Sequence, residues 1–235
     1  MPNWVKNIIE VAGDKNDIDN FLQKVRSDQS AFDFNQIIRM PDSLNMTSGG
    51  ITGVAILYYI SNRLKLTPAE VESLPDSKCL DTWFRKNIAE QMDVLREGIA
   101  KGRYRRSALY KDGKAYVENY RLYGATTRYD WSIYNWGTKW NSCETSMTRT
   151  SPNSCTITFD TAWSMPQPII ERMIERYPQL SFRGKFADED LGYNCGKWAS
   201  DNGKLCIYDT DNLRLACEVW EYDYNEVSKE YAHDV

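Results

Sequence analysis

Strand-like and helix-like apolar patterns follow one another in the first 47 residues. A Val- and Ile-rich segment predicts a strand over residues 3–11. Asp17 then precedes a stripe of apolar residues with a helical period, which predicts a short amphipathic helix. The stripe consists of Ile18, Phe21, Leu22 and Val25. Apolar residues alternate again over residues 32–40, so we expect a second strand there, ended by Pro41.

Residues 48–141 carry helical patterns with no convincing strand. Residues 51–64 are apolar on nearly all sides, which is typical of a helix buried inside a domain. Thr67 and Glu70 form a capping box with proline at the first helical position, and they predict the start of another helix. A further apolar face predicts a helix that ends at Lys101-Gly102. Its members are Phe84, Ile88, Met92, Leu95 and Ile99.

Strand patterns return after a polar stretch over residues 142–154. Alternation predicts strands over residues 155–163 and 180–186, with an amphipathic helix between them that Ser164 caps and Pro178 stops. Asn202-Gly203 between two further strands is a strong hairpin signal. The segment after it, up to Val227, fits a strand or a helix equally well.

This order of elements predicts an α+β fold. Strand-helix-strand occurs twice and is the ferredoxin-like βαββαβ plan, followed by an extra C-terminal hairpin. We therefore expect a ferredoxin-like antiparallel sheet from residues 1–47 and 142–235. Residues 48–141 form a large helical insertion packed against it, placed between the second and third strands because a hairpin tip tolerates added chain.

Five segments carry a family resemblance: MPNWVKNIIEVAG, FDFNQIIRMP, YDWSIYNWGTKWN, TFDTAWSMPQPIIERM and FADEDLGYNCG. They resemble the ferredoxin-like domain family of uncharacterised proteins encoded by phages, prophages and conjugative plasmids. The family has no established enzymatic activity. The resemblance therefore implies the fold and an origin in a mobile genetic element, and it implies no reaction.

The composition of the chain argues against several kinds of catalytic and binding site. His233 is the only histidine and stands three positions from the end, which argues against Ser-His-Asp and Cys-His catalysis. Neither a phosphate-binding loop nor a dinucleotide-binding glycine motif is present, and the six cysteines match no zinc spacing. With no signal peptide and no apolar run near 20 residues, we expect a cytoplasmic protein with reduced thiols, without cofactor or membrane contact.

Three tryptophans stand close together in YDWSIYNWGTKWN, residues 129–141. Trp131 does not share a helical face with Trp136 and Trp140, and Asn135 and Gly137 suggest turns. We interpret the segment as an irregular junction between the helical block and the sheet, whose large aromatic side chains are buried. A stacking platform for single-stranded nucleic acid or a nucleotide is the alternative, because such sites combine aromatic rings with cations.

Charge is unevenly distributed, although the net charge is only -4. Residues 95–128 contain nine basic and three acidic residues, among them Arg103, Arg105 and Arg106, which could bind phosphates or an acidic partner. Residues 187–235 contain four basic and twelve acidic residues. Candidate partner-binding residues in this acidic end are Asp188, Glu189, Asp190, Glu218, Trp220, Glu221, Tyr222 and Asp223. Solvated faces are the simpler interpretation of both segments.

Three functions fit these observations. The first is a non-enzymatic phage or plasmid protein that inhibits a bacterial host protein, in an anti-defence role such as anti-CRISPR. The second is a nucleic-acid-binding accessory protein that uses the basic residues of the helical insertion. The third is a metal-dependent enzyme around Asp188, Glu189 and Asp190, although three consecutive residues cannot all point into one pocket. We expect the first.

Overall fold

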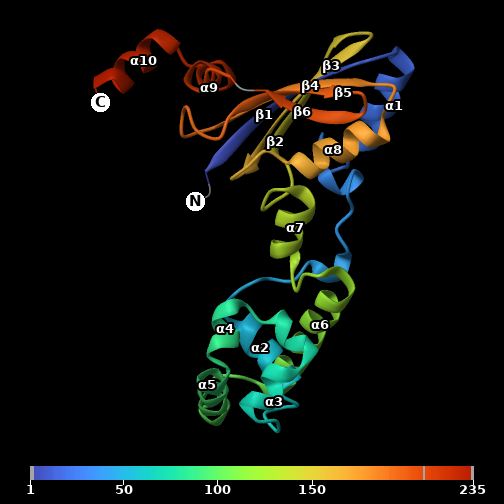
Figure 1. The fold of residues 1–235 in the computed structure, drawn as a ribbon. Coiled ribbons are helices and arrows are strands. Elements are labelled where there is room, and N and C mark those ends of the chain that lie inside the picture. The colour runs from blue at the N-terminus through green and yellow to red at the C-terminus, as the bar shows by residue number, and fades with distance from the viewer. Residues whose placement is uncertain (1–2, 209, 234–235) are drawn as a thin grey trace. The chain divides into compact units, whose positions relative to one another are not determined.

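The computed structural model describes residues 3–208 and 210–233 and divides the chain into two compact units (Figure 1). The sheet unit consists of the chain up to Arg39 and again from Ser132 onward. The helical unit consists of Met40–Trp131. Helix α7 (Arg128–Trp136) runs through the second boundary between them.

Six strands form the sheet in the order β2-β3-β1-β4-β5-β6, and all neighbouring strands are antiparallel. They are β1 (Trp4–Ala12), β2 (Cys143–Ser151), β3 (Ser154–Ala162), β4 (Ser181–Asp188), β5 (Gly196–Asp201) and β6 (Lys204–Tyr208). Helix α1 (Lys15–Val25) follows β1, and α8 (Gln167–Arg176) follows β3. The first four strands with these two helices are the ferredoxin-like arrangement, so the predicted fold class and the hairpin β5-β6 are confirmed.

Helices cover both faces of the sheet. Val5, Ile9 and Val11 of β1 are buried, as are the apolar stripes of α1 and α8, and Phe21 of α1 packs edge-on against Phe182 of β4. Ile8 and Ala187 point the other way because side chains alternate across a strand. They pack with α9 (Asn212–Trp220), which was ambiguous in the sequence. Helix α10 (Tyr224–His233) follows it.

The predicted strand over residues 32–40 is wrong. The segment contains a single 3-10 turn, η1 (Phe34–Gln36), and the missing strand is β2, which the sequence pattern left as a polar stretch. Asp33 explains the difference, because its carboxylate accepts hydrogen bonds from the Asn35 backbone (2.9 Å) and from Asn141 (2.7 Å). Burial opposes ionisation, but these hydrogen bonds outweigh it and hold the pKa of Asp33 below its ordinary value. The helical insertion thus follows the first helix rather than the second strand.

The helical unit contains α2 (Gly50–Ile60), α3 (Pro68–Ser73), α4 (Thr82–Lys86), α5 (Ile88–Ala100) and α6 (Arg106–Tyr123). The 3-10 turn η2 (Asp42–Leu44) precedes α2, and η3 (Pro75–Cys79) connects α3 to α4. The capping box at Thr67 is confirmed, with Glu70 accepting from the Thr67 backbone at 2.7 Å. The predicted helix through Phe84 and Ile99 is divided at Asn87, which ends α4 and starts α5.

The tryptophan segment forms a helix and a turn rather than an irregular junction. Trp131 and Trp136 on α7 are buried, and the chain then turns at Gly137 with φ of 76°. The Trp136 ring packs edge-on against Phe34, and its Nε1 donates to the Ile38 carbonyl at 2.9 Å. The expected burial of these two tryptophans is therefore confirmed, while Trp140 is only half-buried.

No helix in the described ranges is both long and apolar enough to cross a membrane.

Candidate functional site

A strained turn in the helical unit is the starting point of the candidate site. After α2, the consecutive residues Asn62, Arg63 and Leu64 all have positive φ, at 50°, 61° and 67°. Residues other than glycine rarely adopt this left-handed conformation, which costs about 1–2 kcal/mol for each residue. Such strain persists where the surrounding structure enforces it, and it is concentrated at functional sites.

Fully buried Ser61 holds the turn in this conformation. Its hydroxyl donates to the Tyr58 carbonyl at 3.3 Å and accepts from the Leu64 backbone at 3.1 Å. The Arg63 backbone donates to the same Tyr58 carbonyl at 2.9 Å. These bonds fix where the side chains of Arg63, Leu64 and Lys65 leave the turn.

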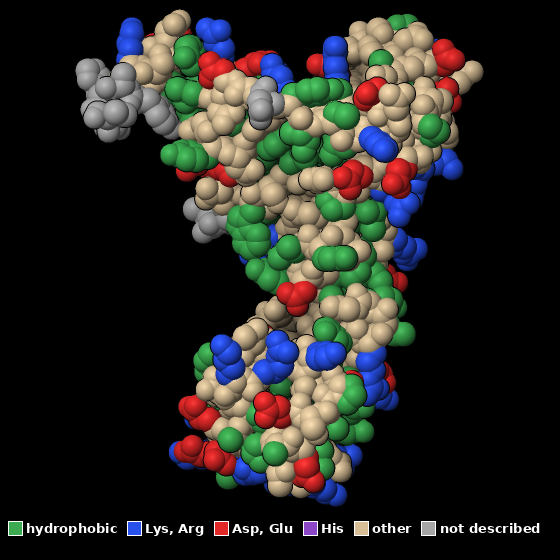
Figure 2. All heavy atoms as spheres, in the orientation of Figure 1, with side chains coloured by type: hydrophobic (Ala, Val, Ile, Leu, Met, Phe, Trp, Pro, Cys, Tyr) green, Lys and Arg blue, Asp and Glu red, His purple; other side chains and the backbone are tan. Residues whose placement is uncertain are grey.

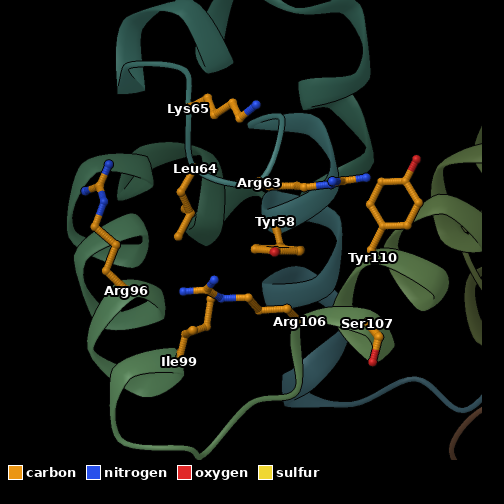
Figure 3. Close-up of a pocket in the computed structure, with 9 residues that line it drawn as sticks. All are labelled: Tyr58, Arg63, Leu64, Lys65, Arg96, Ile99, Arg106, Ser107 and Tyr110. Atoms are coloured by element: carbon orange, nitrogen blue, oxygen red, sulfur yellow. The ribbon is translucent and has the colours of Figure 1, made fainter.

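The turn faces an open hollow of about 640 Å³ within the helical unit, which we call the basic hollow (Figure 3). Three elements besides the turn line it: α2, α5 and the start of α6. The lining residues are Tyr58, Arg63, Leu64, Lys65, Arg96, Ile99, Arg106, Ser107 and Tyr110. Four of these nine are cations and none is acidic, so the hollow has a positive potential that attracts anions.

The four cations differ in their protein partners. Arg96 pairs with Asp93 at 2.7 Å on the exposed face of α5. The Arg63 guanidinium lies over the Tyr110 ring, 4.6 Å from its centroid, which orients it beside the hollow. Among the described residues, no carboxylate pairs with Arg63, Lys65 or Arg106. Three cations therefore reach the hollow without a neutralising partner.

Only one of the three arginines predicted from the GRYRRS segment belongs to this hollow. Arg106 lines it from the first turn of α6, whereas Arg103 and Arg105 are exposed in the connection from α5 and do not line it. Figure 2 shows Lys and Arg side chains on the visible face of the helical unit with Asp and Glu among them. Positive charge is therefore concentrated in the hollow, while the visible face of the helical unit as a whole carries charges of both signs.

The acidic loop predicted as a partner or metal site has internal hydrogen-bond partners. Asp188 is buried, and its carboxylate accepts from Asn3 (3.3 Å), Asn194 (3.1 Å) and the Asp190 backbone (2.9 Å). Glu189 accepts from the Trp4 backbone at 3.1 Å. No group of three metal-ligating side chains occurs in the part of the chain that the structure describes. The loop therefore fastens the start of β1.

The candidate residues at the acidic end are also largely engaged within the sheet unit. Glu218 pairs with Lys185 at 2.8 Å and Lys197 at 3.4 Å, and the cations hold its pKa below the ordinary value. Trp220 donates to the Asp188 carbonyl at 2.9 Å. Glu221 ends α9 in the left-handed conformation, and Asp223 accepts from the Asn225 backbone at 2.8 Å. Tyr222 is the most exposed aromatic of this set, at 55%.

The buried thiols are poorly suited to act as nucleophiles. Burial raises the pKa of Cys79 to about 11, with a further contribution from the nearby Asp76 carboxylate. Burial likewise raises the pKa of Cys155 to about 11. Because the thiolate is the reactive form, these two residues are nearly unreactive at neutral pH.

Comparison with known proteins bears on the sheet unit. Residues 135–231 match a family model. Its description is the ferredoxin-like domain in Api92-like protein, and the matched range contains every strand except β1. The match agrees with the predicted resemblance to a ferredoxin-like domain family. A phage or plasmid origin stays a prediction.

One solved structure is similar to the chain over most of its length. It is the crystal structure of a protein api92 from Yersinia pseudotuberculosis, with 12% sequence identity and a TM-score of 0.43. The similarity covers 89% of this chain and 99% of that one. No curated protein matches the chain.

Sequence reasoning found Arg106 and, within residues 95–128, Arg96, but it missed Arg63 and Lys65. These two follow an apolar helix in the segment SNRLKL, whose composition is that of an ordinary connection. Nothing in the letters Asn62-Arg63-Leu64 indicates three left-handed residues. A basic pair directly after a fully apolar helix was the available signal, and it is weak.

Proposed function

We propose that this chain is a binding protein for single-stranded nucleic acid, and that the basic hollow of the helical unit takes the phosphate backbone. The observation that carries the proposal is the strained turn that presents Arg63 and Lys65 to the hollow beside Arg106. Phosphates are recognised by clustered Lys and Arg, and a cation without a carboxylate partner releases counterions when it binds them.

The size and walls of the hollow favour a nucleic-acid strand over a free phosphate ion. About 640 Å³ is the volume of a site for an organic ligand. Tyr110, which is 38% exposed, adds an aromatic ring beside the cations, and Leu64 and Ile99 add apolar surface. Proteins that bind single strands combine a basic groove with aromatic rings on which bases stack. A duplex keeps its bases stacked inside, so it would leave these walls unused.

Replacing Lys65 and Arg106 together by glutamine is expected to weaken binding of a fluorescein-labelled oligothymidylate of about 12 nucleotides. A hydrogen bond to a charged group contributes about 1.5–3 kcal/mol, so two lost contacts should raise the Kd by more than about 100-fold. Fluorescence anisotropy at about 0.1 M salt measures the change. Both side chains are exposed, and the fold should therefore be retained.

Arg85 and Lys86 provide the matched control, because both are exposed cations of the helical unit and neither lines the hollow. Their replacement by glutamine removes the same charge and should change the Kd by less than about threefold. Equal weakening by both double variants would show that net charge alone drives binding. Unchanged binding by the Lys65 and Arg106 variant would overturn the proposal.

Inhibition of a bacterial host protein stays a prediction. Most of the acidic and aromatic residues expected to bind a partner are engaged inside the sheet unit, with Tyr222 the main exception. The geometry therefore supports the nucleic-acid proposal more directly. A stoichiometric host protein retained on the tagged chain after nuclease treatment would favour inhibition instead.

A further inference from the structure

A second strained residue lies in the sheet unit. Trp163 directly follows β3 and has φ of 76°, which is unfavourable for a bulky aromatic residue. Its side chain is 40% exposed, so the ring is not fully buried and its burial does not explain why the strained backbone is kept. Its backbone donates to the Asn3 carbonyl at 2.9 Å, and its carbonyl accepts from Asn194 at 2.8 Å.

Trp163 belongs to an aromatic cluster around one cation, which we call the tryptophan cluster. Lys139 Nζ lies 4.8 Å from the ring centroid of Trp163 and 4.8 Å from that of Trp140. Trp140 in turn packs against Trp4 of β1, with centroids 5.7 Å apart. Two indole rings thus flank one ammonium group, and a third ring packs behind one of them.

The acidic loop positions this cluster. Asn194 links the two, since its amide donates both to the Asp188 carboxylate (3.1 Å) and to the Trp163 carbonyl (2.8 Å). Glu189 accepts from the Trp4 backbone. Two of the carboxylates that the sequence suggested as a binding site therefore hold the backbones of Trp4 and Trp163 in place.

We propose that the tryptophan cluster is a second contact site for single-stranded nucleic acid, at which an unpaired base stacks on Trp163 and its phosphate pairs with Lys139. A part-exposed indole beside an ammonium group is the combination that binds a base and a phosphate together. The inference rests on the proposed function for its ligand class, but on none of the residues of the basic hollow.

Replacing Trp163 by asparagine tests the site, because asparagine tolerates the left-handed backbone. We expect the Kd for the labelled oligothymidylate of about 12 nucleotides to rise about tenfold, the effect of losing one stacked base. Trp83 is the matched control: it is 57% exposed in the helical unit, and its replacement by alanine should leave the Kd unchanged. Replacing Lys139 by glutamine should weaken binding and reduce its salt dependence.

Photo-crosslinking separates this inference from the proposed function. An oligothymidylate containing 4-thiothymidine should crosslink to the peptide that contains Trp163 in the wild-type chain and in the Lys65 and Arg106 variant. No crosslink at Trp163 in either protein, or an unchanged Kd for the Trp163 variant, would overturn the tryptophan cluster as a site. A crosslink at Trp163 with an unchanged Kd for the Lys65 and Arg106 variant would overturn only the basic hollow.

Discussion

Replacing Trp136 by alanine is expected to lower the free energy of unfolding by about 3–5 kcal/mol, the usual cost of truncating a buried aromatic residue. Trp136 is 4% exposed, packs edge-on against Phe34 and donates from Nε1 to the Ile38 carbonyl. Truncation leaves a cavity between α7 and the segment that follows α1. It also leaves the Ile38 carbonyl without this donor. Urea denaturation followed by circular dichroism measures the loss.

Trp83 again serves as the control, because the same substitution there removes an exposed ring. Its replacement by alanine should change the free energy of unfolding by less than about 1 kcal/mol. Since Trp136 belongs to the sheet unit, a separate transition of the helical unit should keep its midpoint. A Trp136 variant as stable as the wild type, but defective in binding, would make this tryptophan a ligand contact instead.

Replacing Gly113 by alanine is expected to destabilise the helical unit by about 1–3 kcal/mol, as overpacking of a closed interface does. Gly113 lies in α6 where it contacts α2, and an added Cβ would stand 2.1 Å from the Ala55 carbonyl oxygen. A side-chain rotation cannot relieve a clash with backbone, so the two helices must move apart. Alanine favours a helix over glycine by about 1 kcal/mol, which offsets part of this cost.

Gly50 is the matched control for this substitution. It lies in the first turn of α2, and no heavy atom is within 4 Å of the Cβ that alanine would add. Alanine there should be neutral or stabilising by up to about 1 kcal/mol. Thermal unfolding of both variants gives the comparison. A Gly113 variant that is as stable as the Gly50 variant would contradict the close approach of α2 and α6.

Strong local patterns predicted most of the fold. The structure contains the elements that these patterns predicted. The patterns are the Val- and Ile-rich segment of β1, the alternating apolar residues of β3, the capping box at Thr67 and the turn at Asn202-Gly203. The failure concerns two segments of opposite character. Phe32 and Phe34 are as apolar as strand residues, but Asp33 between them is bound by Asn141, more than a hundred positions away. A contact that distant leaves no local pattern.

Strand β2 was missed for the complementary reason. It is an edge strand with no fully buried residue, and its Ser- and Thr-rich sequence has no apolar alternation to detect. Only its pairing with β3 makes it a strand. Polar edge strands of this kind resist aggregation, so their sequences are selected against the pattern that identifies strands.

The candidate sites depend even more on the tertiary structure. Arg63 and Arg106 are more than forty positions apart and meet only because α2 and α6 pack together. The tryptophan cluster joins Trp4, Trp140 and Trp163. Of the three tryptophans that the sequence grouped, only Trp140 belongs to it, while Trp131 and Trp136 are buried. The sequence indicated the residue types of the proposed sites, but not their grouping.

The salt dependence of oligothymidylate binding tests the central claim most directly. Each phosphate contact with a single strand contributes a slope of about -0.7 to a plot of log K against log salt concentration. We predict that the variant with glutamine at Lys65 and Arg106 has a slope about 1.4 smaller in magnitude than the wild type, while the Arg85 and Lys86 variant keeps the wild-type slope. The same slope in all three proteins would contradict a phosphate-binding role for the basic hollow.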